Sequence, residues 1–365
     1  MTLDICDLIE RLARIPGPSG HEDAVCLAIQ EELGELGAAT VVDAIGNLVL
    51  RLSGPSGAPS LMLMAHMDQI GFVVRHVDDD GSIYCDASGL VDERTILAAQ
   101  IEIWTDNGPR VGVIGVRSRH LLMDAELLEA IRVDDLWVDV GARSAVEAAE
   151  LGVEVGQPAT LRGEHVRLNE RMLVGPAIDN RAGCATLIEL ARRASVRARE
   201  VELLFVWSTQ EEVGSRGAKV AAQWLQPTAA VVVDTVPAGD PSTPARRAAT
   251  RIGYGPVIRA QDRRGGQGTI YSVPIRRRLK EIARSLHVEY QLDVFPTWTD
   301  ACEVHLAGRG IPTGGVFIPR LCSHSPNEIL DVRDVSATVA LLDEFVQLDA
   351  ETATLLAQRP TAPLA

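Results

Sequence analysis

Two kinds of hydrophobic pattern alternate along most of the chain. Apolar positions recur at helical spacing near the start, and helices are predicted at 3–14, 22–36, 182–195, 217–225, 275–286 and 333–348. Continuous apolar runs of strand length lie between them, at 41–42, 48–50, 61–65, 201–206, 229–233 and 316–318. Strand, helix and strand in this order predict βαβ units and a parallel sheet with right-handed crossovers. The segment 237–272, rich in proline, glycine and arginine, is predicted to be largely loop.

A different pattern interrupts this order from about residue 71 to residue 165. Short alternating stretches are separated there by turn signals such as Asp80-Gly81 and Asn107-Gly108, with one helical segment near 144–151. This is the pattern of a small all-β module. We therefore predict an α/β catalytic domain made of residues 1–70 and 166–350, an inserted β domain at 71–165, and a flexible tail at 351–365.

Composition narrows the possible fold class and the possible binding partners. The chain has 365 residues, more than one hydrophobic core usually supports, which agrees with two structural units. Only 4% of the residues are aromatic, so the core is aliphatic, as in buried parallel strands. A net charge of -15 repels phosphate backbones and disfavours nucleic acid as a partner.

Cysteines and hydropathy bear on the compartment. The six cysteines form no C-x-x-C pair, and a chain of this length needs no disulfide staples, so reduced thiols are expected. The N-terminus lacks the basic start and apolar run of a signal peptide. The sequence also lacks a stretch of about 18 apolar residues that would predict a membrane span. We expect a cytoplasmic protein that does not enter a membrane.

Candidate metal ligands follow the predicted strands. His66 ends the run at 61–65, and Asp234 ends the run at 229–233. Glu212 follows the run at 201–206, His324 follows the run at 316–318, and Asp179 lies in a Gly/Pro loop just before a helix. Ligands of open α/β sheets bind beyond the carboxyl ends of the strands, and charges there are costly unless they are paired or bound to metal. We therefore expect these five side chains to converge.

Two histidines and three carboxylates suit two metal ions better than one. Five ligands cannot all serve a single tetrahedral ion with an open position, but they serve two ions if one carboxylate bridges. We assign Asp179 as the bridge, with His66 and Asp234 completing one site and Glu212 and His324 the other. Imidazole and carboxylate suit Zn²⁺, and also Co²⁺ or Mn²⁺.

Two further carboxylates are assigned supporting roles. Glu211 precedes the ligand Glu212 and points in a different direction, so it is predicted to be the general base that takes a proton from water and passes it to the leaving amine. Asp68 lies two residues after His66 and is predicted to orient its imidazole.

Each of these motifs has a common, less informative interpretation. A His-x-Asp is usually a surface pair, a Glu-Glu usually starts a helix, an Asp after a strand often caps a helix, and Asp-Asn-Arg is commonly a turn. Their joint order favours the metal site. Cys184 and Cys322 are interpreted as packing residues. No G-x-S-x-G elbow indicates a serine hydrolase, and the glycines at 265–268 lack the G-K-[ST] of a phosphate loop.

The chain as a whole resembles the tetrahedral aminopeptidase family, which includes glutamyl and deblocking aminopeptidases and proteins sometimes labelled endoglucanases. The matching motifs are Ala65–Gly71, Gly175–Arg181, Gln210–Ala218, Val233–Asp234, His324–Pro326, Val138–Ala142 with Leu151–Val153, and Gly310–Thr313. They span most of the chain, from about 5 to 345.

The resemblance implies a zinc-peptidase-like α/β/α catalytic domain with an inserted, barrel-like β domain for dimerisation. It implies removal of N-terminal residues from short peptides, and self-association into dimers and a tetrahedral dodecamer. It agrees with Asp179 as bridge and Glu211 as base. Two places depart from the family: the arginine before His324 is shifted, in Pro319-Arg320-Leu321-Cys322-Ser323, and Trp298 stands where glycine is usual.

Other functions stay open at this stage. A specialised amide hydrolase or deacylase of a small N-acyl metabolite would keep the metals and lose the need for a free ammonium. A glycosidase would need two carboxylates and no metal, and a non-catalytic scaffold would leave Glu211 unused. The arginines at 259, 263 and 264 are either contacts for an anionic substrate group or part of a solvated loop.

Overall fold

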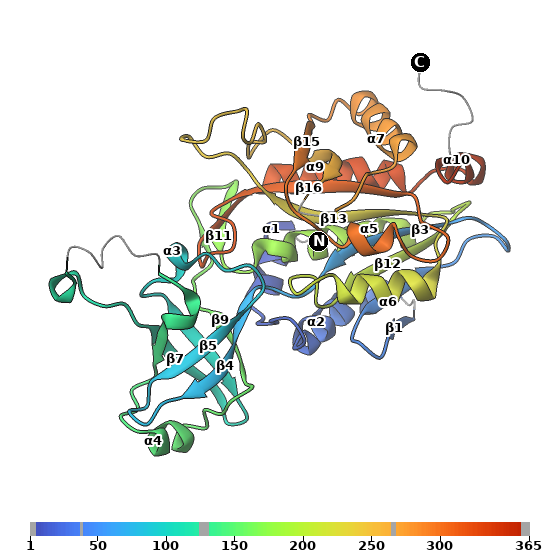
Figure 1. The fold of residues 1–365 in the computed structure, drawn as a ribbon. Coiled ribbons are helices and arrows are strands. Elements are labelled where there is room, and N and C mark those ends of the chain that lie inside the picture. Colours follow the sequence, from blue (N-terminus) through green and yellow to red (C-terminus); the bar gives the residue numbers. More distant parts are fainter. Residues whose placement is uncertain (1–4, 37–38, 124–130, 264–267, 359–365) are drawn as a thin grey trace.

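Two β-structures organise the computed structural model, which describes residues 5–36, 39–123, 131–263 and 268–358 (Figure 1). Within these residues an eleven-stranded mixed sheet forms one part and a closed β-barrel forms the other. In Figure 1 the barrel, in blue to green, lies to one side of the sheet and its helices. The α/β class with an inserted barrel is therefore confirmed.

The large sheet is parallel at its centre. Its strands are β1 (Thr40–Val42), β2 (Leu48–Leu52), β3 (Ser60–His66), β10 (Val166–Arg167), β11 (Met172–Gly175), β12 (Glu202–Ser208), β13 (Ala229–Pro237), β14 (Val257–Asp262), β15 (Gln291–Phe295), β16 (Thr313–Leu321) and β17 (Glu328–Asp331). The main path runs β1-β2-β12-β3-β13-β16-β17-β11-β10. Strands β12, β3, β13 and β16 are mutually parallel. Their carboxyl ends consequently share one edge of the sheet.

Helices cover both faces of this sheet. They are α1 (Ile5–Ala13), α2 (Asp23–Leu33), α5 (Ile178–Ser195), α6 (Arg216–Leu225), α7 (Val273–Ser285), α8 (Ala301–Val304), α9 (Val332–Phe345) and α10 (Ala350–Leu356), with a 3-10 turn at Gly34–Leu36. Successive side chains of β3 point to opposite faces of the sheet and so belong to two separate hydrophobic clusters. Leu61 and Leu63 pack with α1, α2, α5, α7 and α9, whereas Met62 and Met64 pack with α6 and α8. The same alternation in β12 and β13 produces an α/β/α sandwich.

The barrel follows β3 directly. Its strands are β4 (Gly71–Val77), β5 (Ile83–Ser88), β6 (Gln100–Thr105), β7 (Gly108–Ile114), β8 (Trp137–Asp139) and β9 (Pro158–Leu161), closed in the order β4-β5-β8-β7-β6-β9. Short helices α3 (Glu93–Ile96) and α4 (Ala145–Glu150) and 3-10 turns at Arg119–Leu121 and Val133–Asp135 connect them. The barrel has its own aliphatic core, which includes Val74, Ile83 and Ile101. Its strands fall inside the predicted insert, while the exact boundaries at 71 and 165 stay a prediction.

Two segments expected to be irregular contain regular elements. Strand β14 lies inside the segment 237–272, which is otherwise largely loop as predicted, and helix α10 covers the start of the segment 351–365, whose assignment as a tail stays a prediction. Strand β14 was not predicted because Arg259 interrupts its apolar run. In the structure this arginine is fully buried. Helix α10 begins after Asp349, whose side-chain carboxylate caps the helix by accepting from the amide of Thr352. The helix is short and shows little apolar periodicity, so the sequence did not predict it.

Arg259 is neither a substrate contact nor part of a solvated loop. Its guanidinium donates to Asp262 at 2.9 Å and to Asp293 at 2.8 and 2.9 Å, and its Cζ lies 3.9 Å from the ring centroid of Phe317. These partners come from β14, β15 and β16, so the arginine joins three strands at the edge of the sheet. Arg263 is exposed, and position 264 lies outside the described residues.

The remaining expectations concern disulfides and membrane-spanning helices. None of the six cysteines, all of which lie among the described residues, forms a disulfide, and four of them are buried. Among the described residues, every helix is too short or too polar to cross a membrane.

Replacing Arg259 with methionine is expected to lower the free energy of unfolding by about 3–5 kcal/mol, because two carboxylates would stay buried without their cation. Chemical denaturation followed by circular dichroism measures the change. Arg263→Met is the matched control and should change stability by less than about 0.5 kcal/mol. Equal, small effects of both substitutions would show that the buried ion pairs do not hold this edge together.

Candidate metal centre

The five predicted ligands meet at the carboxyl edge of the parallel strands. His66 is the last residue of β3, Glu212 follows β12 and His324 follows β16. Asp234 lies inside β13 rather than at its end, because that strand continues to Pro237. Asp179 lies in the first turn of α5, where it and Asn180 have non-helical backbone angles.

The broken turn of α5 is fixed by side-chain hydrogen bonds. Asn180 donates through Nδ2 to the carbonyl of Val233 at 3.0 Å and accepts from the amide of Gly183 at 3.0 Å. The amide of Asp179 donates to Glu328 Oε2 at 3.0 Å. The Asp179 carboxylate is therefore held between two strands rather than along the helix.

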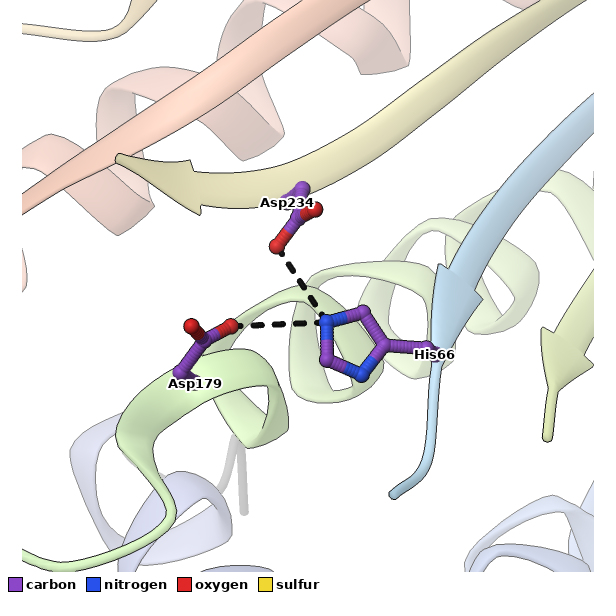
Figure 2. A group of neighbouring side chains, drawn as sticks. All are labelled: His66, Asp179 and Asp234. Carbon is purple, nitrogen blue, oxygen red and sulfur yellow. Dashed lines mark ion pairs between the residues drawn. The ribbon is translucent and has the colours of Figure 1, made fainter. Parts of the chain in front are cut away.

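His66, Asp179 and Asp234 form the first triad. Figure 2 shows His66 Nε2 directed at both carboxylates, with Asp179 Oδ1 and Asp234 Oδ1 each 3.4 Å away. All three residues are buried.

Asp179, Glu212 and His324 form the second triad. His324 Nε2 lies 3.2 Å from Asp179 Oδ2 and 3.6 Å from Glu212 Oε1. The two oxygens of Asp179 thus face different histidines. Each triad offers one ligand atom per residue, with the three atoms within 4.8 Å of one another.

The donor atoms fit metal ions. Asp179 Oδ1 and Glu212 Oε1 are buried and have no hydrogen-bond partner, an arrangement that is costly unless a cation takes their lone pairs. Ligands about 2.0–2.1 Å from a tetrahedral Zn²⁺ lie about 3.3 Å from one another. The spacings between histidine nitrogens and carboxylate oxygens are of that size.

Crowded carboxylates perturb the titration of the site. Burial, reinforced by Asp234 and Glu212, raises the pKa of Glu211 well above its usual value. Burial also raises the pKa of Glu212, to about 7. Burial alone would lower the pKa of His66, but Asp234 and Asp179 raise it well above the ordinary value. Each shift has the direction expected where negative charge lacks a compensating cation.

Asp68 connects the first histidine to the turn that carries both glutamates. Its Oδ1 lies 3.4 Å from His66 Nδ1 and accepts from the amide of Glu211 at 2.9 Å. Its Oδ2 accepts from the amide of Glu212 at 3.1 Å and from the hydroxyl of Ser19 at 2.6 Å. One buried carboxylate therefore lies beside the imidazole, whose Nδ1 is 3.1 Å from the backbone carbonyl of Asp68, and holds the turn that carries both glutamates.

Glu211 faces the same cavity as the ligands. A cavity of about 160 Å³ is lined by side chains from both triads and by Glu211, and its far wall is formed by Phe295, Pro296 and Trp298. Glu211 is buried and stands beside His66 and Asp234, whose charges act on it.

Three buried residues near the ligands were not predicted as site residues. Arg320 contacts Asp179 Oδ2, lies 3.3 Å from Glu328 Oε1 and donates to Thr235 Oγ1 at 2.6 Å. Glu328 also accepts from the amide of His324 at 2.8 Å. Asp300 accepts from the Ser208 hydroxyl, and burial raises its pKa to about 7. The shifted arginine was visible in the sequence, but its contact with Asp179 was not.

Comparisons with known proteins agree with this geometry. The model of the M42 glutamyl aminopeptidase family matches residues 46–341. A lysyl aminopeptidase of Pyrococcus furiosus is 31% identical over 351 residues, which cover 94% of this chain and 98% of the relative.

Solved structures are similar over nearly the whole chain. An aminopeptidase of the archaeon Desulfurococcus kamchatkensis has a TM-score of 0.91 at 31% identity, covering 98% of this chain and 99% of its own. The TET1 peptidase of Pyrococcus horikoshii, which can assemble into a tetrahedron or a large octahedral shell, has a TM-score of 0.83 at 31% identity, covering 94% and 99%.

Replacing Arg320 with methionine is expected to tighten binding of a divalent cation at the second triad by at least about ten-fold. A guanidinium in contact with Asp179 repels an added cation, and at such distances the repulsion amounts to a few kcal/mol. Titration calorimetry of the chelator-treated protein with Co²⁺ measures the affinity. Arg320→Lys keeps the charge and should bind Co²⁺ as the unmodified protein does. Unchanged or weaker binding by the methionine variant would contradict this role.

Proposed function

Because this chain belongs to the M42 glutamyl aminopeptidase family, we propose that it removes N-terminal residues from short peptides by using two divalent metal ions and a glutamate base. The observation that carries the proposal is the placement of Asp179, whose two carboxylate oxygens face two different histidines. A single ion would need only one of these triads.

The residues would divide between the ions in a simple way. His66 and Asp234 would hold one ion, Glu212 and His324 would hold the other, and Asp179 would bridge them. Zn²⁺ suits these donors best, with Co²⁺ and Mn²⁺ as alternatives. When bound, such a pair polarises the scissile carbonyl and lowers the pKa of water.

Glu211 is the residue we assign to proton transfer. It is buried beside both triads and faces their cavity, yet it belongs to neither triad. Burial is the main cause of its raised pKa. A carboxylate with a raised pKa takes up a proton from water more readily and can later give it to the leaving amine. Asp68 holds Glu211 in place through the backbone amide and acts as a positioning residue.

The surplus of carboxylates favours a substrate with a free ammonium. Besides the ligands, Glu211, Asp300 and Glu328 are buried around the site. A positively charged N-terminus is stabilised by such a field, while a neutral N-acyl group gains nothing from it. An aminopeptidase therefore uses this site better than a deacylase does.

Self-association is part of the proposal. The TET1 peptidase of Pyrococcus horikoshii can assemble into a tetrahedron or a large octahedral shell, and one of its structures is a dodecamer. Similarity over 94% of this chain supports our proposal of assembly through dimers into a tetrahedral dodecamer. Six cysteines without a disulfide among them support function in a reducing compartment such as the cytoplasm.

Replacing Glu211 with glutamine is expected to lower kcat on an aminoacyl-p-nitroanilide by about 10²–10⁴-fold, because the amide cannot accept the proton. Metal content, measured by mass spectrometry, should stay at two ions per chain. Glu202→Gln is the matched control, since Glu202 begins the same strand at the opposite edge of the sheet and pairs with Arg51 at 2.7 Å. Full activity of the Glu211 variant would rule out this residue as the base.

Blocking the substrate's amino group is expected to abolish cleavage. Leucine p-nitroanilide should be hydrolysed and its N-acetyl form should not, because only the free ammonium meets the acidic field. Chelator should remove the activity, and added Zn²⁺, Co²⁺ or Mn²⁺ should restore it. Preference for the blocked substrate would favour the deacylase, and activity that survives chelation would contradict both metal-dependent functions.

A further inference from the structure

A loop of the barrel lies against the second triad. Residues 89–92, here called the barrel loop, connect β5 to α3. Leu90 of this loop lines the cavity together with Glu212 and His324, and its side chain is 56% exposed. The loop belongs to the inserted barrel, while both metal ligands it meets belong to the α/β domain.

A hydrogen bond from this loop fixes the orientation of His324. Its Nδ1 lies 2.6 Å from the carbonyl oxygen of Leu90. A carbonyl only accepts, so Nδ1 carries a proton and donates, and in the neutral ring Nε2 would then offer its lone pair to a cation held by Asp179 and Glu212. The Thr95 hydroxyl, in α3, lies 2.8 Å from the carbonyl oxygen of Asp92 in the same loop and 3.3 Å from the backbone carbonyl oxygen of His324, so its proton is shared between the two acceptors.

The first histidine has no such dependence on the barrel. His66 Nδ1 lies 3.1 Å from the carbonyl of Asp68, two residues away on its own chain segment. Both histidines are therefore oriented by a backbone carbonyl, but the carbonyl for His324 comes from the other part of the molecule. Partners of this kind fix the tautomer of a ligand and typically change metal affinity by about 10–100-fold when they are lost.

Gly89 brings the loop close enough to make this contact. Its φ is +95°, and an added Cβ would lie 2.9 Å from Ile70 Cγ2, 3.2 Å from Glu212 Cβ and 3.3 Å from Glu212 Oε2. A side chain at this position would push the loop away from Glu212, and the Leu90 carbonyl would move with it.

We propose that the barrel loop is a positioning element for the second metal site, so that the placement of the barrel sets the affinity of that site and leaves the first site unaffected. The inference rests on the proposed two-metal function. It gives the inserted barrel a role in the chemistry of its own subunit, separate from any role in assembly. The ion held by Asp179, Glu212 and His324 is then the one that movement of the barrel releases.

Gly89→Ala and Gly108→Ala form a matched pair that tests the loop. Gly108 lies in the same barrel at a φ of +97°, but an added Cβ there meets nothing within 4 Å. The two substitutions impose the same backbone strain, and only the first disturbs the loop at the metal site.

The full chain, treated with chelator, would be titrated with Co²⁺ in a calorimeter, and the visible absorption spectrum of the Co²⁺-loaded protein would report ligand geometry. In Gly89→Ala the weaker of two binding steps should lose about 10–100-fold in affinity and the spectrum of the second ion should change. The other step should stay as it is in the unmodified protein. Gly108→Ala should match the unmodified protein in both steps.

A second pair covers the case in which Gly89→Ala does not fold. Thr95→Val removes the hydroxyl that reaches the His324 carbonyl, and Thr105→Val removes a hydroxyl that closes the remote β6–β7 turn by donating to Gly108 O at 2.7 Å. Only Thr95→Val should weaken the second step, by a few fold.

The outcomes separate the two claims. If Gly89→Ala and Thr95→Val both show the two binding steps and the Co²⁺ spectrum of the unmodified protein, the role of the loop is overturned and the two-metal function stays intact. Loss of both steps in the same variants would overturn the independence of the first site. An unmodified protein that binds fewer than two ions would contradict the proposed function itself, and with it the inference.

Discussion

Repulsion among buried carboxylates is the constraint around which this structure is arranged. At one edge of the sheet Asp179 offers ligand atoms within 4.8 Å of those of Asp234 on one side and of Glu212 on the other, and Glu211 and Asp68 are buried nearby. Burying such charges without cations costs several kcal/mol per ion. The two histidines and Arg320 compensate part of this charge, and two metal ions would compensate more. Parallel strand ends, the broken turn of α5 and the Asp68 hydrogen bonds all serve to hold these groups at that spacing.

The two triads differ in what supports them. The first is built on β3, β13 and the start of α5, within one domain, and its histidine takes its hydrogen-bond partner from the same segment. The second depends on the turn after β16 and on a carbonyl from the barrel. Arg320 also contacts the Asp179 oxygen that faces the second triad. If both triads bind metal as proposed, the second site would be the weaker and the more sensitive to surrounding structure.

Much of this arrangement could be predicted from the sequence, because buried parallel strands appear as unbroken apolar runs and their ends are marked by charged residues. His66 and Asp234 were singled out in this way, and the fold class was confirmed. Asp179 was singled out by its place in a Gly/Pro loop before a helix, and the ligand role of all three residues stays a prediction. What could not be predicted depends on tertiary pairing. Strand β14 was hidden by a buried arginine whose partners come from β15 and the end of β14 itself. The Leu90 carbonyl was hidden because a backbone group leaves no signal in the residue type.

Locating bound ions tests the central claim most directly. Crystals of the protein grown with Zn²⁺ would be measured at the zinc absorption edge, and the anomalous difference map would be searched around Asp179. The account predicts two peaks about 3.5–4 Å apart, one beside His66 and Asp234 and the other beside Glu212 and His324. A single peak at full occupancy, or peaks away from Asp179, would contradict the shared-carboxylate site.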